Sequence, residues 1–521
     1  MNHDSPGVRV ILRDGFLEVT GEVPGLREKL RYYRRAIEQE GYERKVVSHY
    51  EDLYTDDPDN PGRIVTMPGF AHRVLEQCRK AGMGFEFIDA RTPMPAPNYE
   101  KAFRGLREYQ IPLVGKMLQS GGGILRGSTG MGKTCASAAI IRAFDRRELF
   151  SRGTPTCVFA CPDRDINRKN WEEFQHWLPD REIGLIMSGT SHKPSDDVVC
   201  CTIDSLENID PNQVGILIVD EMHASASTGR AEKISLFQKA RKWGVSATPT
   251  GRFDGADIVS EGLYGPIVAE FTYQDGVKTG ALVPITVYWL PCPPPVCGLD
   301  MYGRFKKREA KIRHGSTIND DFGQMVADIF NCTPDNQQIL GIMAFIEQMY
   351  HVHKFCNKTG CIHAETNADK LASYPGIPAI KAKERKEIYD AFKDGRLMSM
   401  LATHVWSTGV DFRNLNIVVN IGGGGSEIVA KQVPGRASRK TDGKDHAYIV
   451  DFVHPWDRED PVSGTGKPGP LLKNDISRRK AYKQLGFEQC NVESITQLPF
   501  LDPQLVRQAP SVLRSTRNQL F

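Results

Sequence analysis

One short segment restricts the fold of this chain more than any other. Residues 127–134, Gly-Ser-Thr-Gly-Met-Gly-Lys-Thr, match the pattern G-x-x-x-x-G-K-[ST], between the apolar run GGILR and the helical pattern TCASAAIIRAF. Glycines let such a loop curl around phosphate oxygens, and the following helix adds the positive end of its dipole. The segment therefore predicts a phosphate-binding strand–loop–helix unit in a parallel α/β sheet.

The residues of this loop predict how a nucleoside triphosphate is bound. We expect Lys133 to contact the β- and γ-phosphates and the hydroxyl of Thr134 to ligate Mg²⁺. A glycine-rich turn that binds nothing is the alternative, and the flanking strand and helix argue against it. The other loop residues expected to contact the nucleotide are Gly127, Ser128, Thr129, Gly130, Met131 and Gly132.

An acidic pair follows a second apolar run. Asp220 and Glu221 come directly after GILIV, and α/β sheets place their ligands at the carboxyl ends of strands. Asp220 is predicted to hold Mg²⁺ through water, and Glu221 to activate the attacking water molecule. A solvated acidic turn would explain the pair equally well on its own, but the upstream loop favours the catalytic interpretation.

The hydrophobic pattern predicts two similar α/β domains. Residues 99–283 alternate amphipathic segments with the strand-like runs GGILRGS, TCVFACP, VVCCTID, GILIVDE and KWGVSATP. Residues 284–490 repeat the theme with ILGIMAFI, GCIHAE, SMLATHV, NIVVNIG and DHAYIVDF. Such alternation is typical of a parallel sheet covered by helices on both faces. Residues 491–521 are polar with scattered apolar positions and are predicted to be a loosely attached tail.

Residues 1–98 predict a small α+β accessory domain. VRVILR and GFLEVTG are strand-like, and RIVTMP, FAHRVLEQCRKAG and FEFIDA form a β-α-β pattern. GLREKLRYYRRAIEQ carries apolar residues at helical spacing, with Leu26, Leu30, Tyr33 and Ile37 expected on the buried face. The arginines beside that face would be solvated or would contact nucleic acid.

Composition excludes several classes of protein. The 521 residues include 67 Lys and Arg against 64 Asp and Glu, so nucleic acid is not bound by bulk charge, although a local basic groove is possible. The 12 cysteines are scattered, as expected of reduced thiols. No apolar run approaches the ~20 residues of a membrane span, and the N-terminus lacks a signal-peptide layout. We expect a cytoplasmic protein without a membrane partner.

Further motifs follow in the order found in superfamily 2 helicases, which the chain resembles between about residues 104 and 455. In the first domain these are LREYQ at 106–110, ACPD at 160–163, TIDSL at 202–206, DEMH at 220–223 and SAT at 246–248. In the second they are STGVD at 407–411 and QVPGRASR at 432–439. LYGPIVAEFTYQDGVKTGALVP and ERKEIYDAFKDGRLMSMLATHVWSTGVDFRNLN resemble the XPB, RecG and UvsW group, with the phage UvsW-type helicases as the nearest likeness.

The resemblance implies two tandem RecA-like domains with ATP bound between them. Further residues implied in ATP binding are Arg107, Gln110, Gly409 and Asp411, where Gln110 would read adenine. Residues of the second domain implied in hydrolysis are Gln432, Arg436 and Arg439. Gln432 would orient water or the γ-phosphate, and the arginines would compensate the developing charge. Hydrolysis would therefore require the domains to close around the nucleotide.

The resemblance also implies coupling and nucleic-acid-binding residues. The residues expected to couple the ATP state to strand movement are His223, Ser246 and Thr248. The residues expected near the nucleic-acid backbone are Pro162, Arg164, Thr202, Ser205 and Thr403. Met222 departs from the alanine usual in the DEAH motif, and since methionine is apolar and flexible we expect hydrolysis to be retained.

The function implied is that of an ATP-dependent DNA helicase or translocase. It would act as a monomer, remodelling or unwinding branched DNA in replication, recombination or repair. An RNA helicase is one alternative, since RNA helicases share the motor. A nucleic-acid annealing or binding protein with a vestigial ATP site is another, and the presence of Lys133, Glu221 and Arg439 argues against it.

A cluster of histidines and cysteines invites a zinc interpretation. His351, His353, Cys356, Cys361 and His363 lie within a short stretch and include residue types that bind zinc. The hydrophobic pattern splits them between a helix and the next strand, so that they would have to converge across a turn. Solvated histidines at a helix end are the favoured interpretation.

Overall fold

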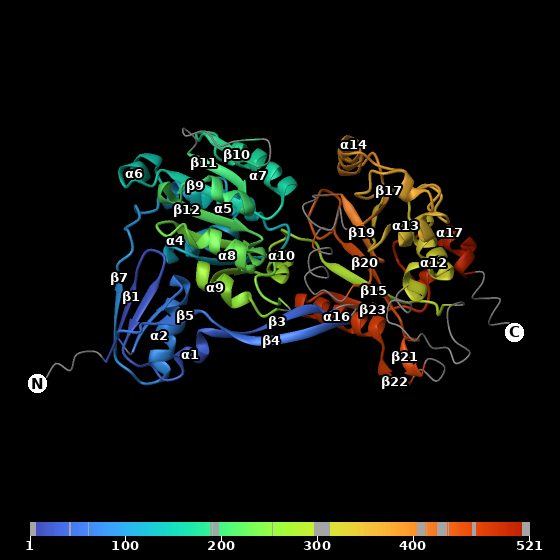
Figure 1. Ribbon diagram of the computed structural model, residues 1–521. Helices are drawn as coiled ribbons and strands as arrows, with labels where there is room; N and C mark the ends of the chain where they lie inside the picture. The colour runs from blue at the N-terminus through green and yellow to red at the C-terminus, as the bar shows by residue number, and fades with distance from the viewer. Residues whose placement is uncertain are drawn as a thin grey trace, which may run out of the picture. The chain divides into compact units, whose positions relative to one another are not determined.

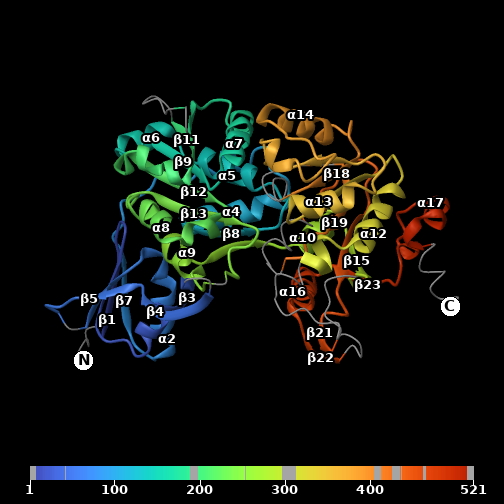
Figure 2. The ribbon, with the colours of Figure 1, turned by 45° about the vertical axis from the view of Figure 1, so that its right-hand side comes forward.

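The fold is described from a computed structural model (Figures 1 and 2). The residues that the structure describes are 7–40, 43–60, 62–187, 190, 197–252, 254–295, 313–403, 412, 414–424, 435, 437–460 and 465–512. The chain divides into two compact units, Met1–Thr272 and Tyr273–Phe521. In the described part, no helix is long and apolar enough to cross a lipid bilayer, and the eleven cysteines found there are free thiols.

The first unit begins with a five-stranded sheet of order β5-β6-β2-β1-β7. Its strands are β1 (Val8–Leu12), β2 (Leu17–Thr20), β5 (Tyr54–Asp56), β6 (Arg63–Thr66) and β7 (Phe85–Asp89). Helix α2 (Ala71–Lys80) packs on it, and alternating residues of β1 and β2 face the buried core. These elements confirm the predicted small α+β fold.

The predicted helix over GLREKLRYYRRAIEQ is wrong. Only α1 (Leu26–Lys29) is helical, and β3 (Arg31–Glu40) pairs antiparallel with β4 (Glu43–Asp52). The ring of Tyr33 contacts that of Tyr50 in a tilted arrangement, with 5.2 Å between the ring centroids, and Tyr33 is 47% exposed instead of buried. The apolar residues have helical spacing, but pairs of opposite charge across the hairpin stabilise the strand conformation instead, because cross-strand pairs contribute strongly to the stability of a strand.

The basic flank expected beside that helix is therefore a set of ion pairs. Arg31 bonds Asp52 at 2.8 Å, and Arg34 pairs with Glu51, which also accepts a hydrogen bond from Tyr32. Arg27, in α1, bonds Asp56 at 2.7 Å. Arg27, Arg31 and Arg34 are accordingly not an unpaired basic patch.

The N-terminal domain docks on helix α9 (Asp257–Tyr264) of the following domain. Glu261 of α9 accepts two hydrogen bonds from Arg73, the longer at 2.6 Å, and lies 2.8 Å from His72 Nε2. The turn η1 (Pro68–Phe70) lies so close to α9 that a Cβ on Gly69 would come within 2.1 Å of the Glu261 carbonyl oxygen. Only glycine allows this approach.

The large sheet of the first unit has seven parallel strands in the order β10-β11-β9-β12-β13-β8-β14. They are β8 (Gly123–Gly127), β9 (Thr156–Cys161), β10 (Ile183–Ile186), β11 (Val198–Thr202), β12 (Val214–Asp220), β13 (Arg241–Ser246) and β14 (Ile267–Phe271). The helices are α3 (Tyr99–Phe103), α4 (Gln110–Ser120), α5 (Lys133–Arg142), α6 (Arg146–Ser151), α7 (Arg164–Trp177), α8 (Thr228–Ser235) and α9. Alternate residues of β12 enter separate cores on the two faces, so both faces are covered (Figure 1).

The second unit repeats this architecture. Its seven parallel strands are β15 (Ile285–Pro291), β16 (Gln338–Ile342), β17 (Gly360–Ile362), β18 (Ser399–Ala402), β19 (Leu415–Asn420), β20 (Ala447–Val453) and β23 (Glu488–Asn491). Its helices include α10 (Tyr273–Lys278), α12 (Asp320–Asn331), α13 (Ile346–His353), α14 (Ala382–Lys393), α16 (Pro470–Leu485) and α17 (Pro503–Gln508). Counted in chain order, the strands of both large sheets are arranged 3-4-2-5-6-1-7. The predicted fold class, two tandem parallel-sheet α/β domains, is confirmed.

The C-terminal segment is not the loose tail that was predicted. β23 ends at Asn491, the first residue of the predicted tail, and pairs with β15 at the edge of the sheet, whereas α17 lies within the tail. Apolar residues of this segment fill one of the two large cores of the second unit, and they include Val492, Ile495, Leu498, Phe500, Leu501 and Val506. Their irregular spacing reflects turns and short helices, which give no period in the sequence. Residues 513–521 lie outside the described residues.

A buried cluster of charges supports the second unit. Arg478 of α16 is 2% exposed, and its guanidinium bonds Asp451 of β20 at 3.0 Å and Asp475 at 2.9 Å. The same guanidinium donates to the carbonyl oxygens of Gly423 (2.7 Å) and Gly424 (3.2 Å), in the loop after β19. The cluster therefore fixes that loop to the core through a single side chain.

Candidate functional site

The phosphate-binding loop lies between β8 and α5, as predicted. Gly130 and Gly132 have φ values of 90° and 86°, in the left-handed region that favours glycine. A Cβ on Gly132 would come within 2.5 Å of the Gln110 amide nitrogen. The Ser128 N–H donates to the Phe271 carbonyl at 2.9 Å, which anchors the loop to β14. That the loop residues, including Thr129, contact the nucleotide stays a prediction.

The segment upstream of α4 is clamped to this loop. Gln110 is buried, and its amide donates to the Met131 carbonyl at 2.8 Å and accepts from the Arg107 N–H at 2.9 Å. Tyr109 donates a second hydrogen bond to the Met131 carbonyl at 3.1 Å. Gln110 thus supports the loop directly, and its role in reading adenine stays a prediction.

The acidic pair terminates β12. Asp220 is nearly buried, and its carboxylate accepts a hydrogen bond from the Glu221 N–H at 3.0 Å. Burial, and then the charge of Glu221, raise the pKa of Asp220 to about 7, while the Lys133 ammonium opposes the shift. On α5, Thr134 donates to the side-chain oxygen of Asn170 at 3.2 Å. The loop and the acidic pair follow strands on either side of β13, at the same edge of the sheet.

The raised pKa of Asp220 gives a pH-dependent prediction. A carboxyl whose pKa is higher in the folded state than in the unfolded chain lowers the free energy of unfolding as pH rises from about 4 to about 7. Asp220→Asn removes this penalty, so without nucleotide the variant should gain stability relative to wild type across that window and equal it below pH 4. Urea unfolding at a series of pH values measures the difference. A stability difference that is independent of pH would contradict the shifted pKa.

A hydrogen-bond network joins the acidic pair to the end of β13. Ser246 donates to Glu221 at 3.3 Å and accepts from the Thr248 N–H at 3.1 Å, and its hydroxyl lies 3.0 Å from His223 Nδ1, within hydrogen-bond distance. Burial lowers the pKa of His223, which favours the neutral ring. The three predicted coupling residues are therefore in one network with the predicted catalytic carboxylate.

Two residues beyond this network were not predicted. Arg252 donates to the His223 carbonyl at 2.8 Å and forms an ion pair with Asp254. The Asp254 carbonyl accepts a hydrogen bond from the Arg35 N–H of β3 at 3.3 Å. The segment after β13 thus connects the network to the N-terminal hairpin. No motif marked these positions, because backbone bonds carry much of the connection.

Met222, the unusual residue of DEMH, has a structural role. Its side chain is fully buried and packs over Gly244 of β13, where a Cβ would come within 2.9 Å of the Met222 Cγ. Met222→Ala should therefore lower the free energy of unfolding by about 2–4 kcal/mol. Gly244→Ala should lower it by about 1–3 kcal/mol through overpacking.

The two substitutions should compensate each other. In a Met222→Ala, Gly244→Ala protein the new methyl group occupies part of the space that methionine leaves, so the double variant should be more stable than the sum of the single effects allows. Urea unfolding of all four proteins measures this coupling. Strictly additive losses would show that Met222 and Gly244 do not share the space.

Predicted nucleic-acid contacts lie at the same edge of the first sheet. Pro162 follows β9, Arg164 begins α7, and Thr202 ends β11 with its hydroxyl 2.7 Å from that of Ser205. The carboxyl ends of parallel strands bring these residues to the side of the sheet that holds the phosphate loop. Their contact with nucleic acid stays a prediction.

The second unit holds the remaining predicted residues. Thr403 follows β18 and is nearly buried, and its N–H donates to the Ile362 carbonyl at 3.1 Å. Arg439 is half-buried and forms a β-bridge with Leu282. The predicted residues outside the described part of the chain are Gly409, Asp411, Gln432 and Arg436.

The histidines and cysteines considered for zinc are separated. His351 lies 2.8 Å from the Asp320 carboxylate, and His363 is buried with its Nε2 2.9 Å from the Pro378 carbonyl oxygen. The helix α13 ends at His353, before Cys356, and Cys361 is in β17. Within the described ranges, no three His, Cys, Asp or Glu side chains are placed to hold a metal ion. His363 directly follows β17, so the cluster is split between a helix and the next strand, as predicted.

A repeated parallel α/β plan with a phosphate loop and an acidic pair is typical of nucleoside triphosphatases with tandem RecA-like domains. The family model for the "Type III restriction enzyme, res subunit" matches residues 104–251, and that for the "Helicase conserved C-terminal domain" matches residues 324–441. Together they cover about half of the chain. The chain belongs to the superfamily 2 helicases.

Individual relatives agree with this family. A helicase of Sulfolobus islandicus filamentous virus is 25% identical over 68% of this chain and 65% of its own length, so the match spans slightly less than two thirds of that relative. The DNA 3'-5' translocase XPB2 of Sulfurisphaera tokodaii is 26% identical over 67% of this chain and 81% of the relative. The structure of S. cerevisiae Dbp5 bound to RNA and ADP BeF3 has the same fold at a TM-score of 0.50, with 14% identity over 80% of this chain and all of that chain.

Proposed function

We propose that this helicase uses ATP hydrolysis to translocate on DNA and to remodel or unwind it. The observation that carries the proposal is the network in which Ser246 bonds both Glu221 and His223. The network joins Glu221, the carboxylate expected to activate the attacking water, to the segment after β13. A change in the bound nucleotide would therefore move that segment. The choice of DNA is supported by the similarity to XPB2, a relative named as a DNA translocase.

The residues of the first unit fit an ATP·Mg²⁺ site. Hard oxygen donors suit Mg²⁺, and the Thr134 hydroxyl and the Asp220 carboxylate are such donors. The raised pKa of Asp220 reflects a buried negative charge that a cation would neutralise. When bound, Mg²⁺ would neutralise charge on the phosphates. Lys133 would hold the β- and γ-phosphates, and Glu221 would accept a proton from the attacking water.

The second unit would complete the reaction. Gln432 would orient water or the γ-phosphate, and Arg436 and Arg439 would compensate the charge on the phosphoryl group. Hydrolysis then requires both units to contact one nucleotide. As the units close and open, the nucleic-acid-binding residues of one unit would move relative to those of the other. The support is the order of the motifs along the chain.

The preferred substrate and the setting are part of the proposal. We propose branched DNA, such as forks and four-way junctions, because the segments around β14 and α14 resemble those of the UvsW-type group. The protein would act as a monomer in the cytoplasm, where a viral or bacterial motor meets its DNA. One of the relatives is a viral helicase, which fits this setting.

ATPase stimulation tests the proposed function. Steady-state hydrolysis is measured with single-stranded, duplex, forked and four-way DNA and with RNA, together with strand displacement on whichever substrate stimulates most. We expect stimulation by DNA, greatest with branched substrates, and its loss in Lys133→Ala. Stimulation by RNA alone would assign the motor to RNA. Annealing that survives Lys133→Ala, without ATPase activity in wild type, would favour the binding-protein alternative.

A further inference from the structure

A cavity lies in the first unit, away from the ATP site. It has a volume of about 200 Å³, and its motor-domain wall includes Gly121, Gly122 and Pro266, which directly precede β8 and β14. The phosphate loop follows the opposite end of β8. The other wall comes from the N-terminal domain, at the end of β1, in η1 and after β7. The cavity is therefore at the amino-terminal edge of the sheet, where the N-terminal domain docks.

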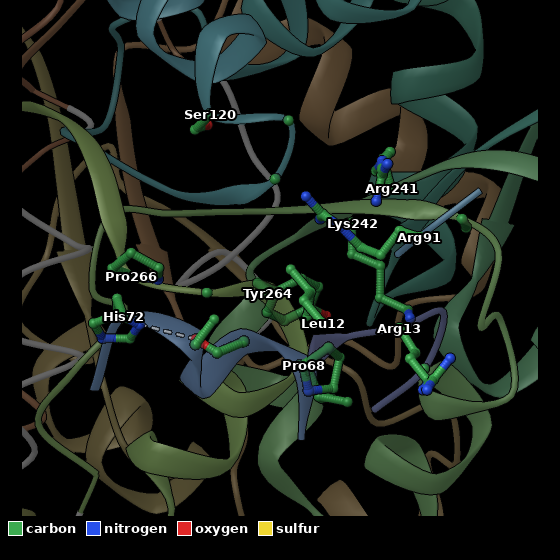
Figure 3. A pocket seen from close by; sticks show the side chains of 18 of the residues that line it. Leu12, Arg13, Pro68, His72, Arg91, Ser120, Arg241, Lys242, Tyr264 and Pro266 are labelled. Atoms are coloured by element: carbon green, nitrogen blue, oxygen red, sulfur yellow. Dashed lines mark hydrogen bonds between the residues drawn. The ribbon is translucent and has the colours of Figure 1, made fainter. Parts of the chain in front are cut away.

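Four cationic side chains line this cavity, and no Asp or Glu is among its described lining residues. Arg13 and Arg91 come from the N-terminal domain, and Arg241 and Lys242 come from the first two positions of β13. Figure 3 shows these four on one side of the cavity and His72 on the other. His72 is engaged by Glu261 and the Gly69 carbonyl, so the cationic side is the side available to a ligand.

Lys242 is the unusual member of this group. It is 8% exposed, and within the described chain its ammonium has no hydrogen bond or ion pair. The nearest charges are those of Asp14 and Arg241, and the Asp14 carboxylate already accepts two hydrogen bonds from Thr92. Burial lowers the pKa of Lys242 to about 8. Burial of most of this side chain disfavours its charge, and an anion in the cavity would offset that cost.

The neighbouring arginines specify the kind of anion. Arg241 donates to the Thr92 carbonyl at 3.0 Å, which fixes its guanidinium beside the cavity. Arg91 and Arg13 form ion pairs with Asp89 (2.6 Å) and Glu18 (3.3 Å), which hold them in place and leave further N–H groups to donate. Guanidinium groups beside an ammonium match the several oxygens of a phosphate group.

We propose that this cavity binds a phosphate group, with Lys242 and Arg241 as its main ligands and Arg91 and Arg13 at its rim. The site is additional to the ATP site and does not depend on the proposed function. A phosphate held there would contact both the N-terminal domain and β13, and so would strengthen their docking. Its source is either a free phosphate compound or a phosphate of the DNA backbone.

Calorimetric titration separates these sources. The full-length protein is first saturated with a non-hydrolysable ATP analogue, so that the phosphate loop is filled, and is then titrated with pyrophosphate or with a short DNA duplex. We expect Lys242→Met to weaken at least one of these bindings by about tenfold or more. Lys239→Met is the matched control, because Lys239 is exposed, precedes the same strand and does not line the cavity.

Each outcome decides the proposal. Weaker pyrophosphate binding assigns a free phosphate compound, and weaker duplex binding alone assigns the DNA backbone. Unchanged binding of both probes in Lys242→Met overturns the phosphate site, whereas the ATPase assay remains a separate test of the proposed function. Arg241→Gln provides a second variant, to be used if circular dichroism shows that Lys242→Met does not fold, and the same criteria apply to it.

Discussion

Glu221→Gln should lower the kcat of ATP hydrolysis by about 10²–10⁴-fold, the usual contribution of a general base. Glutamine keeps the size of the side chain and can still bond Ser246, but it cannot accept a proton from water. Binding of ATP should remain near the wild-type level, because the phosphate loop is unchanged. A coupled assay gives kcat, and titration with a fluorescent ATP analogue gives the affinity.

The control for this prediction is Glu232→Gln, an exposed glutamate on α8 of the same domain. It should hydrolyse ATP at the wild-type rate. Wild-type hydrolysis by the Glu221→Gln protein would show that another group activates the water. A loss of nucleotide binding equal to the loss of hydrolysis would instead point to a damaged loop.

Arg478→Met should lower the free energy of unfolding of the second unit by about 3–5 kcal/mol. The substitution leaves Asp451 and Asp475 buried without their cation, and removing one partner of a buried ion pair is costly even where the intact pair contributes little. It also removes the two hydrogen bonds to the loop after β19. Urea unfolding followed by tryptophan fluorescence reports on the change, because Trp289 lies next to the Arg478 guanidinium.

Lys480→Met is the control for this second prediction, since Lys480 is exposed on the same helix, α16. It should leave stability close to that of wild type. An Arg478→Met, Asp451→Asn protein should recover part of the loss, because one uncompensated charge has been removed. Equal stability of Arg478→Met and wild type would mean that both carboxyl groups are protonated in the variant at no cost.

The sequence predicts the ATP site better than the parts that surround it. Buried parallel strands are continuous apolar runs, so β8 and β12 could be recognised, and the residues after them had to meet at one edge of the sheet. The positions of the Gly-Lys-Thr loop, the acidic pair and the end of β13 at one edge of the sheet could therefore be predicted. The network of Ser246 with His223 and Glu221 lies where the motif order of the family placed those residues.

The features that were missed depend on partners distant in sequence. β3 has helical spacing, and only its pairing with β4 makes it a strand. The role of Met222 depends on Gly244, which is 22 residues away along the chain and directly beneath it in the fold. Arg252 and Arg478 bond backbone carbonyl groups, which leave no mark on the sequence. Long-range packing of this kind is not encoded in local propensity or period.

The strand β13 extends from the edge of the first sheet where its strands begin to the edge where they end. It begins at the cationic cavity with Arg241 and Lys242 and ends at Ser246, about 13 Å beyond Lys242 at the usual rise per residue. Midway, a methyl group on Gly244 would press both on Met222, beside the acidic pair, and on Tyr264, which lines the cavity. One added carbon atom would thus disturb both the acidic-pair edge and the cavity edge of the sheet. A substitution designed for one edge must therefore be checked for its effect on the other.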